Sequence, residues 1–311
     1  MNQTLSKKKS LGHRFILALT TYKSFYIMLI PGLAFIVIFC YGPMFGLAIA
    51  FQNFKVAKGV FNSPWVGFAN FTYLLGNRMF IGAFWNTVMI SLYKILFGFP
   101  VPIILALLIN EVRLSGIRRT VQTIIYLPHF MSWVTMFGLI FVFLGEFGPL
   151  NYIIKALGDK AVFFLSDTRY FRGLLVVSDI WKEMGWNSVI YLAALAGVSQ
   201  ELYESAVMDG ASRIRCILSI SLPSIAPTIA VMFLLRIGGI LNAGFEQIFI
   251  MYNPSVFSVA DIIDTYVYRI GLVNGNFGVS AAAGMFKSVI ACVFVIGTNQ
   301  IMKFFDQESL W

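Results

Sequence analysis

Long apolar stretches are the feature of this sequence that most restricts its fold. About twenty apolar residues in a helix cross the hydrocarbon core of a bilayer. Only 12% of the residues are charged and 59% are hydrophobic, against about 25% and 45–50% in soluble domains. We therefore predict an all-α, polytopic membrane protein with one domain at 25–303 rather than two soluble domains. Its six expected transmembrane helices are 25–51, 84–110, 120–145, 173–198, 225–249 and 279–303.

Two of these stretches are weaker predictions than the others. The fourth contains Asp179, Lys182 and Glu183, a patch that need not meet lipid if it faces a water-filled cavity. The third contains Pro128 and His129, where we expect a break in the helix. The first stretch follows three lysines but is too long for a signal peptide, so we expect an uncleaved span.

The basic residues give an expected orientation. Segments assigned to the cytoplasm hold eleven Lys and Arg, and segments assigned to the other face hold eight. Because cytoplasmic loops are enriched in these residues, we place both termini, 1–24 and 304–311, in the cytoplasm. The outward segments are long and aromatic: 52–83, 146–172 and 250–278. Their aromatic residues either form interfacial belts and pack the loops or provide a docking surface for an external partner.

A charged stretch, 199–223, stands between two apolar ones. Ser199 can cap a helix over 200–208, and Gly210 can end that helix in a left-handed conformation. Ser212 can then cap a second helix. The pattern predicts two short helices joined by a tight turn at the membrane surface. Its charged residues are Glu201, Glu204, Asp209, Arg213 and Arg215.

The same stretch resembles the EAA loop of ATP-binding-cassette (ABC) importer permeases. That loop reads Glu-Ala-Ala, three residues, Gly, nine residues, Ile, any residue, Leu-Pro. Ser205 replaces the first alanine, and "DGAS" at 209–212 is typical of the carbohydrate-importer branch. The fixed positions that match are Glu204, Ala206, Gly210, Ile220, Leu222 and Pro223.

Other segments extend the resemblance over nearly the whole chain, including "FWNTVMISL" at 84–92 and "AAAGMFKS" at 281–288. They look like permeases for oligosaccharides and polysaccharide fragments. The resemblance implies a type I permease in the bacterial plasma membrane, working with a second, different permease, two ATP-binding subunits and an extracellular sugar-binding protein. It also implies an ATPase-coupling site at Glu204, Ser205, Ala206, Asp209, Gly210, Ala211 and Ser212.

The chain contains no G-x-x-x-x-G-K-[ST] phosphate loop. We therefore expect no cofactor in this chain, with ATP and Mg²⁺ bound by the partner ATPase subunits. The net charge of +9 is spread over helix ends without interleaved aromatics, which does not favour nucleic acid. The alternatives to an importer permease are an ion-coupled secondary transporter and a membrane-embedded transferase.

Polar residues within the apolar stretches are candidates for the substrate path. Asn187 and Tyr191 are four apart, as are Asn242 and Glu246, so each pair shares a helix face. With Gln247, these five residues are our candidate sugar contacts. Further candidates are Asn86, Trp181, Trp186 and Asn253.

Three cations lie within the predicted spans, namely Lys94, Arg236 and Lys287. An intramembrane charge is costly unless it is paired or hydrated. We expect pairing with Asp179, Glu183 or Glu246, or with backbone carbonyls at a kink; the alternative is that these cations bind hydroxyls or carboxylates of the sugar. On that expectation the path is close to neutral and the substrate is a neutral or mixed oligosaccharide.

Overall fold

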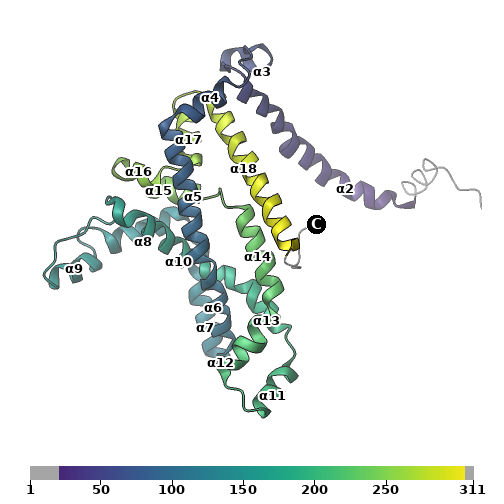
Figure 1. The fold of residues 1–311 in the computed structure, drawn as a ribbon, viewed down its shortest axis with the longest axis vertical. Coiled ribbons are helices and arrows are strands. Elements are labelled where there is room, and N and C mark those ends of the chain that lie inside the picture. Colours follow the sequence, from purple (N-terminus) through teal and green to yellow (C-terminus); the bar gives the residue numbers. More distant parts are fainter. Residues whose placement is uncertain (1–20, 305–311) are drawn as a thin grey trace, which may run out of the picture.

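The computed structural model describes residues 21–304, and helices make up most of this range (Figure 1). Predictions for the N-terminal lysines and most of 304–311 lie outside it. The longer helices are α2 (Lys23–Phe35), η2 (Gly42–Phe51), α4 (Ala69–Gly76), α5 (Arg78–Gly98), α6 (Pro100–Asn110), α7 (Ser115–Tyr126), α8 (Trp133–Leu144), α9 (Pro149–Ala156), α10 (Thr168–Ala196), α11 (Gln200–Met208), α14 (Ala226–Gly238) and α18 (Phe277–Phe304). The shorter ones are η1 (Ile36–Tyr41), η3 (Val56–Lys58), α3 (Gly59–Asn62), η4 (Leu127–Phe130), α12 (Arg213–Cys216), η5 (Ile217–Ser221), α13 (Leu222–Ser224), α15 (Phe245–Met251), η6 (Pro254–Val256), α16 (Phe257–Ala260), α17 (Ile263–Tyr268) and η7 (Arg269–Val273).

Four helical segments among the described residues are long and apolar enough to cross a membrane. They are Lys23–Phe51, Arg78–Asn110, Trp133–Ala156 and Phe277–Gln300. The pair Arg213–Ser224 and Ala226–Gly238, bent by 60°, makes a fifth if it counts as one span. Helix α10 has the length of a span but carries too many charges to pass the same test. The all-α, multi-span architecture is confirmed, whereas the count of six stays a prediction.

The predicted span 120–145 was wrong in extent, because the chain breaks between α7 and α8. Lys182 on α10 fills this break: its ammonium donates to the carbonyl oxygens of His129 at 2.6 Å and Met131 at 2.7 Å. His129 Nδ1 lies 2.8 Å from Glu183 Oε2. A broken helix leaves carbonyls without partners, and a buried lysine supplies the missing donors. The charged patch of α10 therefore serves to satisfy the polar groups of the break between α7 and α8.

The predicted span 225–249 was also wrong in extent. Helix α14 ends at Gly238, and a new helix, α15, begins at Phe245. Gly244 between them has φ of +97°, a left-handed conformation that side chains with a β-carbon rarely adopt. Lys94 on α5 donates to the carbonyl oxygen of Ala243 at 2.9 Å. This break, like the first, is satisfied by a lysine from a neighbouring helix.

Helix α10 runs through the centre of the bundle and packs on α5, α6 and α7. Its contact with α6 is apolar, with Tyr191, Leu192 and Leu195 buried against Ile103 and Ala106. Gly185 allows α7 to approach closely, because a β-carbon there would lie 2.0 Å from the carbonyl oxygen of Ile125. The size of this one residue thus sets the spacing of two helices.

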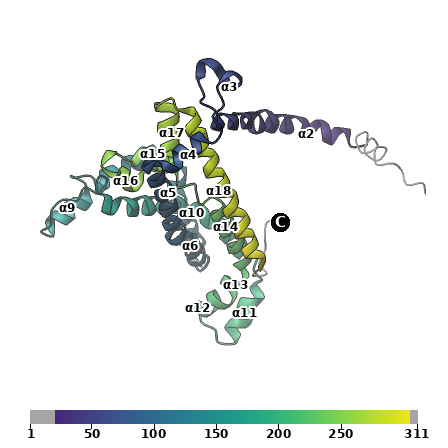
Figure 2. The same cartoon turned by 45° about the horizontal axis from the view of Figure 1, so that its top comes forward.

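The first apolar segment leaves the bundle as an arm (Figures 1 and 2). Its C-terminal part, η2, packs on α18, whereas no residue of α2 is buried. Phe25 and Met28 on α2 are 71% and 79% exposed. The apolar sides of this arm are left for lipid or for another subunit.

Candidate translocation and coupling sites

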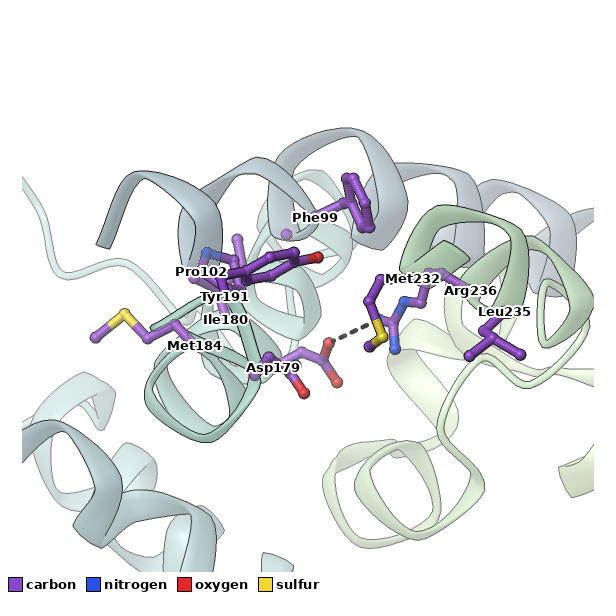
Figure 3. A pocket seen from close by; sticks show the side chains of 11 residues that line it. Phe99, Pro102, Asp179, Ile180, Met184, Tyr191, Met232, Leu235 and Arg236 are labelled. Atoms are coloured by element: carbon purple, nitrogen blue, oxygen red, sulfur yellow. Dashed lines mark ion pairs between the residues drawn. The ribbon is translucent and has the colours of Figure 1, made fainter. Parts of the chain in front are cut away.

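A cavity of about 230 Å³ lies where α6, α10 and α14 meet. Figure 3 shows Asp179 of α10 and Arg236 of α14 reaching toward each other across it, with the rings of Phe99 and Tyr191 on one side. Asn187 also lines the cavity. Polar and apolar walls together are typical of a site that holds a small ligand in one orientation.

Asn187 and Tyr191 lie on one face of α10, as their four-residue spacing predicts. Within the described part of the chain, neither the Asn187 amide nor the Tyr191 hydroxyl has a hydrogen-bond partner. Tyr191 is only 2% exposed, so its hydroxyl borders the cavity rather than bulk solvent. A polar group in this position is available to a ligand.

Asp179 is the centre of a charge cluster beside this cavity. Lys94 Nζ lies 2.8 Å from its Oδ1, and Arg236 Nη2 lies 3.6 Å from its Oδ2. Lys94 is 3% exposed, whereas the Arg236 side chain is 46% exposed. Pairing of both cations with Asp179 is confirmed. The cluster keeps one excess positive charge, carried on the more exposed guanidinium.

Gln247 was predicted to contact substrate, but the structure gives its amide another role. It is fully buried, accepts a hydrogen bond from Lys94, and donates to the Leu175 carbonyl and to Ser178 Oγ, both at 2.8 Å. Because all these partners are internal, Gln247 joins α15 to α5 and α10. We therefore do not place it on the substrate path.

Asn242 and Glu246 remain open to a ligand. Asn242 is exposed and borders a narrow cleft beside Lys94 and Arg236. Glu246 is exposed and, among the described residues, forms no ion pair. The expectation that Glu246 neutralises a membrane cation is therefore wrong. The third cation, Lys287, pairs instead with Asp264 at 2.6 Å.

Two other polar candidates serve the fold. Asn86 donates to the carbonyl oxygens of Ser258 and Asp261 and accepts from Arg172. Asn253 caps η6 and donates to the Leu165 carbonyl. Trp186 is 46% exposed and stacks on His129 with ring centroids 4.7 Å apart. Trp181 is 37% exposed and lines an apolar hollow against α8.

The predicted coupling helices form at the far end of the molecule from α3, α4 and α17 (Figure 1). Ser199 Oγ accepts from the Glu201 amide at 3.3 Å, and α11 covers 200–208 as expected. Gly210 has φ of +76°, and the Ala211 amide donates to the Ala206 carbonyl at 2.9 Å. These bonds close the turn at the C-terminus of α11.

Ser212 then caps α12, because its Oγ accepts from the Arg215 amide at 3.4 Å. Tyr203 on α11 shares a hydrogen bond of 2.9 Å with Ser221 of η5, the helix that continues α12, and this bond fixes α11 relative to that continuation. The two helix ends that flank the turn present Met208 of α11 at 88% exposure and Ile214 of α12 at 71%. An ordered unit with exposed apolar side chains is suited to contact another protein.

No sequence pattern marks the outer cavity between the start of α5, α16 and α17, which Arg78 and Arg269 line. Its residues come from two segments almost two hundred positions apart, so local spacing does not connect them. The apolar residues that close the three-helix cavity, such as Met232, were not predicted either, because they read as ordinary span residues.

Comparison with known proteins gives the context of these sites. A family model described as "Binding-protein-dependent transport system inner membrane component" matches residues 98–308. The chain belongs to this family. It is the membrane-embedded component of a transport system and not an enzyme, which decides against the transferase and ion-coupled alternatives. The EAA-loop resemblance had indicated the same class.

Relatives of this inner membrane component match it along nearly its whole length. Protein LplB of Bacillus subtilis (strain 168) is 46% identical over 96% of this chain and 95% of its own. The polygalacturonan/rhamnogalacturonan transport system permease protein YteP of that strain is 40% identical over 98% and 95%. A chain of a bacterial ABC transporter involved in the import of the acidic polysaccharide alginate has a TM-score of 0.87 at 42% identity, covering 93% and 98%.

Proposed function

We propose that this inner membrane component is one of two different permease subunits of an ATP-driven importer of acidic oligosaccharides. The observation that carries the proposal is the ordered unit of α11 and α12, which is capped at both helix starts and exposed on its turn. A loop with no partner needs no such order, because ordering each residue costs about 1–2 kcal/mol of conformational entropy.

In this proposal the turn of 204–212 enters a groove on a separate ATPase subunit. The chain has no phosphate loop of its own, so ATP and Mg²⁺ are bound by two such subunits. Both termini and the coupling unit then lie in the cytoplasm. The segments 52–83, 146–172 and 250–278 face outward and meet the sugar-binding protein, in keeping with a related transporter solved with an alginate pentasaccharide-bound periplasmic protein.

The apolar arm of α2 supports a second permease. It is part of the segment Lys23–Phe51, whose most apolar 18 residues are only 6% buried, so most of the surface of this segment is free of this chain. The three-helix cavity is also open on one side, since only α6, α10, α14 and the end of α5 line it. A second, different permease would close the translocation path and cover the arm.

The substrate class follows from charge and from the relatives. The cluster of Lys94, Asp179 and Arg236 has one excess positive charge beside the cavity. The relatives YteP and the alginate transporter are named for polysaccharides rich in carboxylates. The neutral or mixed substrate expected from the sequence assumed full neutralisation, which Glu246 does not provide. We therefore propose an acidic oligosaccharide, with Asn187, Tyr191, Asn242 and Glu246 along its path.

Copurification and reconstituted uptake test the proposal. We expect the chain to be isolated from its native membrane with one copy of a second permease and two copies of an ATPase subunit. In proteoliposomes, uptake of oligogalacturonate should require both ATP and the binding protein. Uptake driven by an ion gradient without ATP would contradict the proposal.

A charge-reversal variant tests whether residues 204–212 contact the ATPase. Glu204→Lys reverses a charge of the EAA-like motif and should abolish transport while leaving assembly intact. Glu201→Lys, one turn earlier on the same exposed helix but outside the motif, is the matched control and should keep most of the activity. Equal activity in the two variants would remove residues 204–212 from the ATPase contact.

A further inference from the structure

A second cavity lies at the end of the molecule opposite to α11 (Figure 1). It has a volume of about 390 Å³ and is enclosed by the start of α5, α16 and the junction of α17 with η7. Its polar lining consists of Arg78, Asn86, Ser258, Asp261 and Arg269. The volume falls within the range of small-ligand sites, about 300–1,000 Å³.

This outer cavity has more cations than anions. Arg269 binds Asp261 through two hydrogen bonds of 3.0 and 2.6 Å, so these two charges cancel. Arg172 donates to Asn86 Oδ1 at 2.7 Å and to the Val259 carbonyl at 3.1 Å, and no described carboxylate lies within 4.0 Å of it. Arg78 is exposed and, within residues 21–304, has no hydrogen bond or ion pair.

Among the charged residues that line the cavity, Arg78 is therefore left without a counter-charge from residues 21–304, and Arg172 adds a second guanidinium behind the lining residue Asn86. A net positive charge in a cavity with low-dielectric walls attracts anions. A guanidinium matches a carboxylate in shape and binds it through two parallel hydrogen bonds. The hydrogen-bonded groups around Asn86 fix the wall of the cavity, whereas the exposed side chain of Arg78 is available to bind a ligand.

Aromatic rings lead away from this outer cavity. Phe257 lines it and stacks on Tyr252 with centroids 4.9 Å apart. Tyr252 neighbours Phe249 at 6.1 Å, and Phe249 stacks on Phe245 at 5.2 Å. We call these four rings the aromatic ladder.

The inner end of the aromatic ladder reaches the charge cluster described above. Phe245 follows Gly244 directly, and the preceding residue, Ala243, accepts a hydrogen bond from Lys94. Phe245 and Phe249 stack on each other and also contact Tyr268, yet each stays 37% exposed, so part of each ring is accessible to a ligand. Accessible apolar ring surface suits the apolar faces of pyranose rings.

We propose that the outer cavity binds a carboxylate of an acidic oligosaccharide through Arg78, and that the aromatic ladder guides its pyranose rings inward to the Lys94–Asp179 cluster. This site deepens the proposed function and rests on it. The two parts of this path have different tasks. The guanidinium of Arg78 selects oligosaccharides that carry a carboxylate, whereas the rings of the aromatic ladder accept any pyranose.

The experiment uses the complete importer in proteoliposomes, with oligogalacturonate and its fully methyl-esterified form as matched probes. Arg78→Gln should raise the half-saturating concentration for the acidic probe roughly tenfold, as expected for one lost charge-assisted contact, without changing that for the ester. Arg78→Lys keeps the charge and should restore part of the loss. Because Arg78 is exposed, the variant should assemble normally, which copurification of all subunits checks.

The ladder is tested with the same two probes. Phe249→Leu should raise the half-saturating concentration about three- to tenfold for both, because ring stacking does not depend on the carboxylate. Phe141→Leu on α8, where the ring is 57% exposed and also has an aromatic neighbour, is the control and should have no effect.

The outcomes separate this inference from the proposed function. If the unaltered importer carries the acidic probe and Arg78→Gln has no effect, or affects both probes equally, the outer site is overturned and the function stands. An effect of Phe141→Leu equal to that of Phe249→Leu would overturn the ladder. If the unaltered importer carries neither probe, the proposed function fails together with this inference.

Discussion

Asp179→Asn tests the charge cluster that joins α5, α10 and α14. The carboxylate of Asp179 lies 2.8 Å from the ammonium of Lys94, which is 3% exposed. Removing one partner of a buried ion pair costs about 3–5 kcal/mol, because the other charge stays buried without compensation. Lys94 keeps two acceptors, the Ala243 carbonyl and Gln247 Oε1. Because these acceptors still solvate the ammonium, we expect a loss at or just below the lower end of that range, about 2–3 kcal/mol.

Lys94→Met should cost about as much. It leaves Asp179, whose side chain is 16% exposed, with Arg236 at 3.6 Å, but it removes the donor to the Ala243 carbonyl and to Gln247 Oε1. We expect a loss of about 2 kcal/mol, about 1 kcal/mol for each buried acceptor that loses this donor. In the double variant no unpaired charge is buried, since the Arg236 side chain is 46% exposed and reaches water. The double variant should therefore lose about as much as Lys94→Met alone, and not the sum of the two losses.

Thermal unfolding of the purified permease in detergent measures these losses. At about 2 °C per kcal/mol, Asp179→Asn should lower the midpoint by about 4–6 °C and Lys94→Met by about 4 °C, with the double variant close to the latter. Strictly additive losses would refute the argument that the buried ammonium depends on this carboxylate.

Three further predictions use other parts of the molecule. Gly185→Ala places a β-carbon 2.0 Å from a backbone carbonyl oxygen of α7 and should cost at least about 1–3 kcal/mol, whereas Gly173→Ala on the same helix meets no atom within 4 Å and should be neutral or stabilising in the same unfolding assay. Gly210→Val forces a β-branched residue to φ of +76° and should abolish transport in the proteoliposome assay with assembly intact; normal uptake would argue against the coupling turn. In a cysteine-free background, a cysteine replacing Ser212 should react with an impermeant thiol reagent only from the cytoplasm, and one replacing Asn62 only from outside; the opposite pattern would invert the proposed orientation.

The coupling unit was predictable because its structure is set by local chemistry. Ser199 and Ser212 cap helices that begin at the next residue, and Gly210 is suited to the left-handed turn between them. Each of these bonds joins residues at most five positions apart. A sequence read residue by residue contains all of that information.

The breaks in the membrane helices were predictable only in part. Pro128 marks the break between α7 and α8, but no proline stands between Gly238 and Phe245, so hydropathy indicates one continuous span there. What stabilises the break before α15 is Lys94, which is 149 positions away from Ala243 in the sequence. Hydropathy cannot show which carbonyls a distant lysine will reach.

The assignment of Gln247 failed for a related reason. A polar side chain in an apolar helix either contacts a ligand or satisfies other polar groups of the protein. The choice depends on its surroundings, here the Leu175 carbonyl and Ser178 on α10. Asn187 and Tyr191, with the same kind of sequence signal, have no such partners among the described residues and face the cavity.

Helix α10 links these features into one mechanical element. Asp179 and Glu183 are four residues apart on it, and each carboxylate faces a broken helix: the first through Lys94 and the second through His129. Its C-terminal end continues through only 197–199 into α11, the helix that we propose to contact the ATPase. Because a packed helix moves as a rigid body, we expect a displacement of α11 by an ATPase to reach both breaks together. This arrangement gives a physical reason for a charged helix at the centre of an apolar bundle: its acids hold the two places where the bundle can bend.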